Sequence, residues 1–370
     1  MGVIGITADM NEILWTLDTC YVIVYDRNVN DYVEYNIEGC TMMTSYEVVC
    51  RAIEFRRPER LPVQFEALGM NDFHHVKWNQ IGVGDKRLST SYDEWHCGWQ
   101  RTETPNMGQV KFHPLASQND LKSFQWPDAD DAAFYQGMEN RVAGSEGKYV
   151  TTGIFMLLFE RMQALLGFER TLTGLVLERE WMEALADRIV DFDLGIIENV
   201  SRRFPGVIHG FNFTDDWGTQ RELIINPKLW ESFFRPRYER IFAAIHAAGW
   251  HVWMHSCGKI NAILNSLIEI GVDVIEPQQP RTLGIEEIGR QFRGKVCFAS
   301  LCDIQHTLPM EGEAEIRSEA ERLLAHWATP DGGFILIDYG DGTAIGVGLE
   351  TKRLMLEAFL KADPWARALK

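Results

Sequence analysis

The stretch GVIHGFNFTDDWGTQRELIINPKLWESFFRPRYERIFAAIHAAGWHVWMH, residues 206–255, holds two short apolar runs with a helical segment between them. Continuous apolar runs of this length are typical of parallel strands that are buried on both faces. Asn226 followed by Pro227 supplies a helix N-cap and a first-turn proline. The apolar residues after them fall on one helical stripe: Trp230, Phe234, Ile241 and Ile245. The stretch therefore predicts one strand–helix–strand unit.

The same alternation continues to the carboxyl end of the chain. Further strands are predicted at VDVIEP (272–277), KVCFASL (295–301) and GFILID (333–338), each followed by a helical pattern. Upstream, the runs LPVQF (61–65) and KYVTTGIF (148–155) are strand candidates. Residues 71–147 are expected to form a long excursion with one strand inside it, and DEWHCGWQ (93–100) and GQVKFHPL (108–115) are the local strand candidates there.

About eight strand candidates from residue 62 onward, alternating with helices, favour a closed barrel over an open sheet. No glycine-rich GxGxxG motif follows the first strand, which argues against a dinucleotide-binding sheet. We therefore predict an α/β protein with a (β/α)8 TIM barrel as a single domain over residues 44–370, preceded by an N-terminal extension over residues 1–43.

Composition restricts the partners and the compartment. A formal charge of −17 argues against nucleic acid or an anionic membrane surface as the main partner. Seven cysteines in 370 residues, an odd and sparse set, fit reduced thiols better than a disulfide framework. No apolar run is long enough for a membrane helix and the start shows no export signal, so a cytoplasmic location is expected. The oligomeric state stays open, a homodimer included.

Polar residues follow the predicted strands, where the active site of a barrel is built. His255 and Cys257 lie two apart, so in an extended segment both side chains face the same way. Imidazole and thiolate are zinc ligands, and a catalytic zinc site takes three protein ligands. A buried histidine beside an inert thiol is the alternative. The candidates for a third ligand are Cys302, Asp341, Glu276 and one of the pair Asp215 and Asp216.

Other strand-end residues are candidates for catalysis and for substrate binding. Asp215 and Asp216 are candidates for a paired acid and base, with helix capping as the alternative, and Glu66 is similar. Trp217 and Tyr339 are candidates for stacking on a substrate ring or a methylated cation, with simple packing as the alternative. The rest of the candidate substrate-binding set is polar: Gln220, Glu276, Gln278 and Gln305.

The run FTDDWGTQRELIINPKLWESFFRPRYERIFAAIHAAGWHVWMHSCGKI, residues 213–260, closely resembles the uroporphyrinogen decarboxylase-like superfamily. The segments INAILNSLIEIGVDVIEPQQP (260–280), CDIQHTLP (302–309) and GFILIDYGDGTAIG (333–346) resemble the segments that follow in that family. The resemblance covers roughly residues 44–365 and implies a (β/α)8 barrel.

The superfamily holds metal-free decarboxylases of tetrapyrroles and zinc-dependent methyltransferases that act with a corrinoid protein or coenzyme M. The decarboxylase motif RxAGRxLPEY is replaced here by LPVQFEALGMND (61–72), without the arginine that grips carboxylates. The His-x-Cys pair of the methyltransferases matches His255 and Cys257. The later Cys-Gly turn is replaced by DYGDG (338–342), which puts Asp341 or nearby Tyr339 at the position of the third ligand, with Cys302 as the alternative.

The resemblance thus implies a zinc-dependent methyltransferase, similar to an O-demethylase. It would move a methyl group from a small methylated or methoxylated compound to a corrinoid carried by a partner protein. A metal-free decarboxylase and a non-catalytic ligand-binding barrel are the alternative functions.

Overall fold

The computed structural model describes residues 21–26, 31–36, 42–80, 90–102, 108–117 and 119–366. Most of the predicted N-terminal extension lies outside these ranges. The chain divides into two compact units, Met1–Thr44 and Ser45–Lys370. In the first unit, β1 (Tyr21–Asp26) and β2 (Asp31–Asn36) pair antiparallel, with Tyr21 opposite Asn36.

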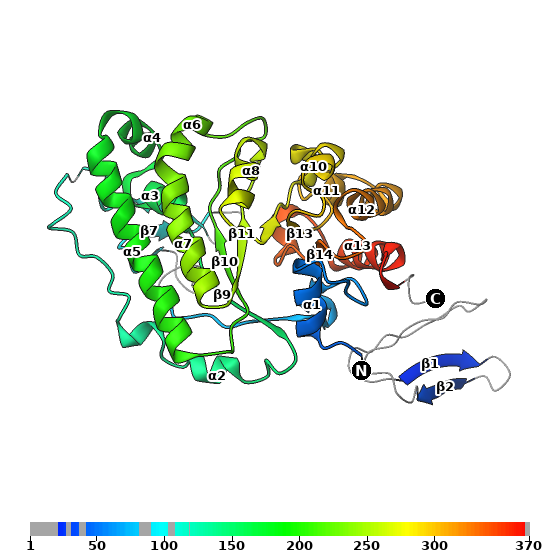
Figure 1. Ribbon diagram of the computed structural model, residues 1–370. Coiled ribbons are helices and arrows are strands. Elements are labelled where there is room, and N and C mark those ends of the chain that lie inside the picture. The colour runs from blue at the N-terminus through cyan, green and yellow to red at the C-terminus, as the bar shows by residue number, and fades with distance from the viewer. Residues whose placement is uncertain are drawn as a thin grey trace. The chain divides into compact units, whose positions relative to one another are not determined.

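The second unit is built around one nine-stranded sheet whose order is β4-β3-β14-β13-β12-β11-β10-β9-β5 (Figure 1). Apart from the β3–β4 pair, neighbouring strands run parallel. The predicted (β/α)8 barrel is confirmed. Seven strands of the barrel pair parallel with one another: β3 (Val63–Phe65), β9 (Tyr149–Ile154), β10 (Gly210–Thr214), β11 (His251–His255), β12 (Val274–Glu276), β13 (Cys297–Ser300) and β14 (Phe334–Ile337).

A short kinked segment closes the barrel between β3 and β9. It consists of β4 (Met70–Asn71) and β5 (Phe73–His75), with Asp72 between them. The Asp72 N–H donates to the Val63 carbonyl at 2.8 Å, and the Asp72 carbonyl accepts from the Tyr149 N–H at 2.9 Å. Asp72 therefore hydrogen-bonds to both β3 and β9 through its own backbone.

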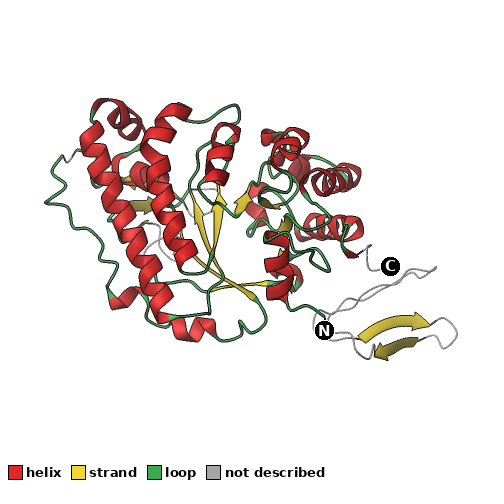
Figure 2. Cartoon of the chain, in the orientation of Figure 1, coloured by secondary structure: helices red, strands yellow, loops and turns green. Residues whose placement is uncertain are grey.

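Helices surround the strands, as Figure 2 shows by colour. The predicted cap at Asn226 is confirmed, because its side chain accepts from the Lys228 N–H and Pro227 is the first helical residue. The longer helices are α1 (Ser45–Ile53), α3 (Phe159–Leu166), α4 (Phe168–Leu177), α5 (Arg179–Arg203), α7 (Arg235–Ala247), α8 (Asn261–Glu269), α10 (Ile285–Phe292), α12 (Glu313–Trp327) and α13 (Leu349–Ala362).

Shorter helical segments lie in the connections between strands and helices. They are η1 (Glu66–Leu68), η2 (Ala132–Phe134), α2 (Met138–Val142), α6 (Pro227–Leu229), η3 (Trp230–Phe234), α9 (Pro280–Leu283), α11 (Thr307–Met310) and η4 (Gly342–Ile345). No helix in the described part of the chain has the length and apolarity needed to cross a membrane.

The excursion over residues 71–147 differs from the prediction of a single strand. Besides β5, it holds an antiparallel sheet of β6 (Thr90–Tyr92), β7 (Gly98–Gln100) and β8 (Gln109–Phe112). β7 and β8 lie within the two local candidates, whereas β6 was not predicted. Strands of only three or four residues show too little alternation for their number to be predicted from sequence. The sheet packs beside the barrel mouth and matters for the site below.

Candidate active site

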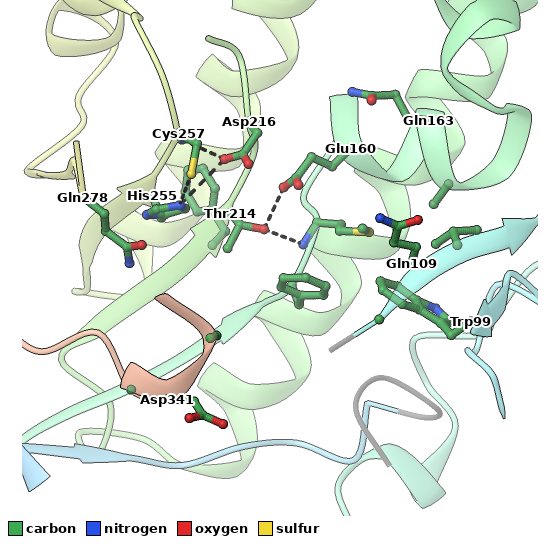
Figure 3. A pocket seen from close by; sticks show the side chains of 18 of the residues that line it. Trp99, Gln109, Glu160, Gln163, Thr214, Asp216, His255, Cys257, Gln278 and Asp341 are labelled. Atoms are coloured by element: carbon green, nitrogen blue, oxygen red, sulfur yellow. Dashed lines mark hydrogen bonds and ion pairs between the residues drawn. The ribbon is translucent and has the colours of Figure 1, made fainter. Parts of the chain in front are cut away.

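A cavity of about 990 Å³ opens at the carboxyl ends of the barrel strands (Figure 3). One side of it is formed by residues that follow β10, β11, β12 and β14, and the other side by α3 and the β6–β8 sheet. The described residues that line it include Trp99, Arg101, Gln109, Val110, His113, Phe155, Met156, Glu160, Gln163, Phe168, Asn212, Thr214, Asp216, His255, Cys257, Glu276, Gln278, Tyr339 and Asp341.

Asp216, His255 and Cys257 bring three candidate metal-ligand atoms to within 4.8 Å of one another. His255 ends β11, and its Nε2 lies 3.4 Å from the Cys257 Sγ and 3.7 Å from the Asp216 Oδ1. The Cys257 N–H donates to the same Asp216 oxygen at 2.7 Å. Spacing in the sequence predicts that His255 and Cys257 lie together, and of the candidate third ligands the structure places Asp216 beside them.

Two glycines allow the loops that carry these donors to meet. Gly218 follows Asp216, and Gly258 follows Cys257 with a φ of +75°, a left-handed conformation that favours glycine. A Cβ at Gly258 would lie 2.2 Å from the Gly218 carbonyl oxygen, and a Cβ at Gly218 would lie 2.3 Å from the Lys259 nitrogen. Side chains at either position would push the loops apart.

Glu276, at the end of β12, fixes the far side of the His255 ring. Its Oε1 lies 3.4 Å from His255 Nδ1, while Oε2 accepts from Trp253 Nε1 at 2.7 Å. Gln278 donates to Oε1 at 3.2 Å. Burial lowers the pKa of His255, but hydrogen bonding to Cys257 and Glu276 outweighs it, so the pKa is raised well above the ordinary value. Burial raises the pKa of the Cys257 thiol, against the opposing effect of His255.

The donor set fits zinc. Metal–ligand distances of about 2.0–2.3 Å in a tetrahedral site place neighbouring ligand atoms about 3.3–3.7 Å apart. The separations from His255 Nε2 to Cys257 Sγ and to Asp216 Oδ1 are 3.4 and 3.7 Å. A carboxylate behind the ring, here Glu276, is the usual outer partner of a zinc-bound histidine. Three donors facing a cavity leave a fourth position for a reactant.

Glu160 is a pocket carboxylate that the sequence prediction missed. It lies in the first turn of α3, and Figure 3 shows its side chain directed toward Asp216 and Thr214. The Thr214 hydroxyl donates to Glu160 Oε2 at 2.7 Å and accepts from the Met156 N–H at 3.0 Å. Burial, followed by the charge of Asp216, raises the pKa of Glu160 to about 8. Its sequence signal is its position as the first acidic residue after the strand KYVTTGIF.

Asp215 does not take the acid or base role that was predicted as one alternative. Its side chain is fully buried and accepts from the N–H groups of Leu158, Phe159 and Glu160 at 2.7–3.1 Å. It also accepts from the Tyr238 hydroxyl. Asp215 therefore caps α3 from outside the pocket, because the backbone turns its side chain away from Asp216.

Three predicted substrate contacts are corrected by the structure. Trp217 has no exposed surface: its ring stacks on Phe159 with centroids 4.2 Å apart, so it packs in the core. Gln220 is exposed and bridges to Gln279 at 2.9 Å, which ties two loops together outside the pocket. Gln305 is also exposed and does not line the pocket, since the chain turns outward at Asp303. Glu276, Gln278 and Tyr339 do line it.

The remaining candidates lie at different places around the barrel. Asp341 lines the pocket but caps η4 by accepting from the Thr343 N–H at 3.1 Å, and it does not belong to the three-donor cluster. Cys302 is fully buried, with its Sγ 3.5 Å from the Ile316 carbonyl oxygen, and burial raises its pKa well above the ordinary value. Glu66 is exposed beside a neighbouring cavity of about 570 Å³. Neither Cys302 nor Glu66 reaches the three donors.

Lys352 holds the loop that carries Tyr339 and Asp341. The buried ammonium donates to Asp338 Oδ2 at 2.8 Å and to the carbonyls of Tyr339 and Gly340 at 2.7 and 3.0 Å. One lysine of α13 therefore holds the loop that follows β14.

Comparison with known proteins supports the fold. The chain is similar to a methyltransferase from Methanosarcina mazei, with 12% identity and a TM-score of 0.62 over 86% of this chain and 98% of that one. A family 10 xylanase from Gloeophyllum trabeum is 14% identical with a TM-score of only 0.39, over 63% of this chain and 82% of that one. No curated protein matches. The model of the family described as uroporphyrinogen decarboxylase (URO-D) matches residues 150–361, and the chain therefore belongs to that family.

Proposed function

We propose that this chain is a zinc-dependent methyltransferase that moves a methyl group from a small methylated or methoxylated compound to a corrinoid carried by a partner protein. The observation that carries the proposal is the cluster of Asp216, His255 and Cys257, whose donor atoms face a cavity at the barrel mouth. Membership of the URO-D family and the likeness of the fold to a methyltransferase support it.

Asp216, His255 and Cys257 would hold the zinc, in place of the predicted third ligands Asp341 and Cys302. Bound zinc supplies a Lewis acid that withdraws charge from the leaving heteroatom as the methyl group departs. Glu276 keeps the His255 ring in the orientation that presents Nε2 to the cavity.

The remaining pocket residues orient the methyl donor and supply a proton. Glu160 lies across from the three donors, where its carboxyl group can give a proton to the leaving oxygen. Thr214 fixes Glu160 by its 2.7 Å hydrogen bond. Phe155 and Met156 line the cavity beside it and reduce the room for water. The corrinoid protein would dock over the mouth, because methyl carbon and cobalt must come within near-attack distance.

Elemental analysis of the purified, reduced protein tests the proposal. About one zinc per chain is expected in the wild type. His255→Ala, Cys257→Ala and Asp216→Ala should each lose it, whereas Cys302→Ala, the same substitution at a thiol outside the cavity, should retain it. A wild-type protein prepared without chelator that contains no zinc would overturn the ligand assignment.

A metal-free decarboxylase is the second candidate, favoured by the family to which the chain belongs. The pocket is poorly suited to a polycarboxylate, because the acidic side chains of Asp216, Glu276 and Asp341 line it. A decarboxylase would remain active after treatment with a chelator, and the proposed methyltransferase would not.

A further inference from the structure

The cavity has two facing walls, and one of them is built partly by residues that precede the segment matching the URO-D family. The metal wall, Asp216, His255, Cys257 and Glu276, lies within the segment that matches the URO-D family, residues 150–361. The opposite wall includes Trp99 and Gln109 of the β6–β8 sheet, which precedes that segment, and Figure 3 shows both on the side away from His255. We call Trp99, Gln109, Phe155, Gln163 and Phe168 the aromatic wall.

Asp93 fixes the aromatic wall from behind. This carboxylate is 3% exposed and accepts from Trp99 Nε1 at 3.0 Å and from the N–H groups of Trp95 and Cys97 at 3.0 and 2.8 Å. The indole N–H of Trp99 thus points toward Asp93, so the part of Trp99 that lines the cavity is carbon. The Trp99 ring lies 6.1 Å from that of Phe155.

A buried ion pair joins the sheet to the helix that carries Glu160. Arg161, 1% exposed, donates to Asp93 Oδ2 at 2.7 Å, and it directly follows Glu160 in α3. Gln163 of the same helix belongs to the aromatic wall. Because a buried pair of this kind is costly to break, the sheet and the helix hold one fixed geometry.

The chemistry of the two walls selects against anions. The aromatic wall offers three rings and two uncharged amides, which suit a flat body with neutral polar substituents. Arg101 is the only lining residue in the described part of the chain with a permanent positive charge, against the acidic side chains of Asp216, Glu276 and Asp341. A positively charged methyl donor would be repelled by bound zinc, whereas a neutral ether offers an oxygen lone pair to the zinc.

We propose that the aromatic wall is the specificity element of the enzyme and holds the flat, uncharged body of the methyl donor, with the methyl-bearing oxygen toward Asp216, His255 and Cys257. The proposal rests on the proposed function, which it extends to a substrate class. In it Phe168 and Gln163 contact the substrate, and Asp93 is a positioning residue that acts through Trp99.

Calorimetric titration with two matched probes, methoxybenzene and 4-methoxybenzoate, tests this on the full chain. The neutral probe should bind, and the anionic probe should bind at least about tenfold more weakly, because the carboxylates repel it. Phe168→Ala should weaken binding of methoxybenzene by roughly fivefold to tenfold. Phe112→Ala is the matched control, since both rings are 52% exposed but Phe112 does not line the cavity.

Asp93→Asn tests the positioning role. The Michaelis constant for a methyl donor and the dissociation constant for methoxybenzene should both rise, while kcat and zinc content stay near those of the wild type. If the variant does not fold, the Phe168→Ala comparison still decides the proposal.

Tighter binding of 4-methoxybenzoate, or equal binding by the Phe168→Ala and Phe112→Ala proteins, would overturn the proposal. These outcomes are separate from failure of the proposed function. Binding is measured both with zinc and after chelation. A protein that binds methoxybenzene but contains no zinc would refute the proposed methyltransferase function and would leave the proposed role of the aromatic wall standing.

Discussion

Glu276, the last residue of β12, connects this strand to β11, which ends at His255. It lies 3.4 Å from His255 Nδ1 and accepts hydrogen bonds from Trp253 and Gln278, so one carboxylate sets the orientation of the imidazole. Orientation of a histidine ligand by an outer carboxylate raises its affinity for metal. At the scale of single residues, the behaviour of the site therefore depends on side chains behind the donors as well as on the donors.

Glu276→Gln is expected to reduce zinc affinity by about 10–100-fold without unfolding the protein, because the amide is isosteric but carries no charge. Competition with a chromophoric chelator measures the affinity. Glu286→Gln, at an exposed acid paired with Arg322, is the control and should leave it unchanged. Equal affinity in the two variants would contradict the outer-partner role.

Asp215 and Asp216 should give opposite phenotypes although they are adjacent. Asp215→Ala leaves three N–H groups of α3 without their acceptor and should lower the free energy of unfolding by about 2–4 kcal/mol. Asp216→Ala should abolish zinc binding and leave the apo-protein's stability within about 1 kcal/mol of wild type. Urea denaturation of the metal-free proteins, with elemental analysis of the same samples, separates the two roles.

The sequence predicted the pairing of His255 and Cys257 because the alternation of side chains along one short extended segment is local. It left the two aspartates undecided, since adjacent side chains in an extended segment point opposite ways and the choice depends on the path of the loop. Glu160 was missed for a related reason: its approach to the cavity depends on how α3 leaves β9.

His246, in the last turn of α7, links this helix to the start of β12. Its Nε2 lies 2.8 Å from Asp273 Oδ2, and the same oxygen accepts from the Val252 N–H of β11 at 2.7 Å. Helix and strands thus share one carboxylate at the end of the barrel opposite the active site. Buried apolar packing is therefore not all that joins α7 to the strands, because the hydrogen bonds of Asp273 join them as well.

The His246 link predicts a pH dependence of stability. The hydrogen bond to Asp273 raises the pKa of His246 above its ordinary value of 6.5. Its contribution is therefore fully present below about pH 6.5 and is lost as the pH rises through the raised value. Because the side chain is 42% exposed, the effect should be on the order of 0.5 kcal/mol. Wild type should exceed His246→Ala in unfolding free energy more at pH 6 than at pH 9, and a constant difference would refute this.

The β6–β8 sheet marks the limit of prediction for elements. Long helices and apolar strands were predicted because their periodicity extends over many residues, as in α5 and β9. Of the three short strands, β7 and β8 fall on predicted candidates and β6 does not. Their packing on the barrel was not predicted, because buried Asp93 and Arg161 hold the sheet there, and a long-range ion pair leaves no local pattern.

Across the whole molecule, closure of the barrel depends on Asp72. Its buried carboxylate accepts from Arg60 at 2.6 and 2.8 Å, from the Ser45 hydroxyl at 2.7 Å and from the Val63 N–H at 2.9 Å. Asp72→Ala should lower the free energy of unfolding by about 3–5 kcal/mol, because it leaves the Arg60 charge without its partner. Differential scanning calorimetry of this variant beside Glu286→Gln, where about 1 kcal/mol or less is expected, checks the prediction.

The core of the barrel begins with α1. Among the described residues, the buried hydrophobic cluster starts at Val49 and continues to Trp365. Because Ser45–Lys370 forms a compact unit, a chain of residues 45–370 should fold with a melting temperature close to that of the full chain. A large loss of stability would show that residues 1–44 contribute to the fold of the second unit.

The overall barrel was predictable because it repeats one motif, and each repeat adds evidence for the same arrangement. The closing segment at residues 70–75 was not, since it replaces a regular strand–helix unit with a kink at one residue. Topology follows from repetition, whereas the exceptions depend on single side chains such as Asp72.

Trp99 and Gln109 lie outside the segment that matches the URO-D family, and this bears on how the pocket can diversify. Mutations at Trp99 or Gln109 would alter the surface proposed to meet the donor, while residues 150–361, which carry His255 and Cys257, keep their sequence. Substrate selectivity would then change among related proteins through substitutions in the β6–β8 sheet, while Asp216, His255 and Cys257 stay the same. The barrel would then keep the three-donor cluster unchanged, while the β6–β8 sheet beside it varies.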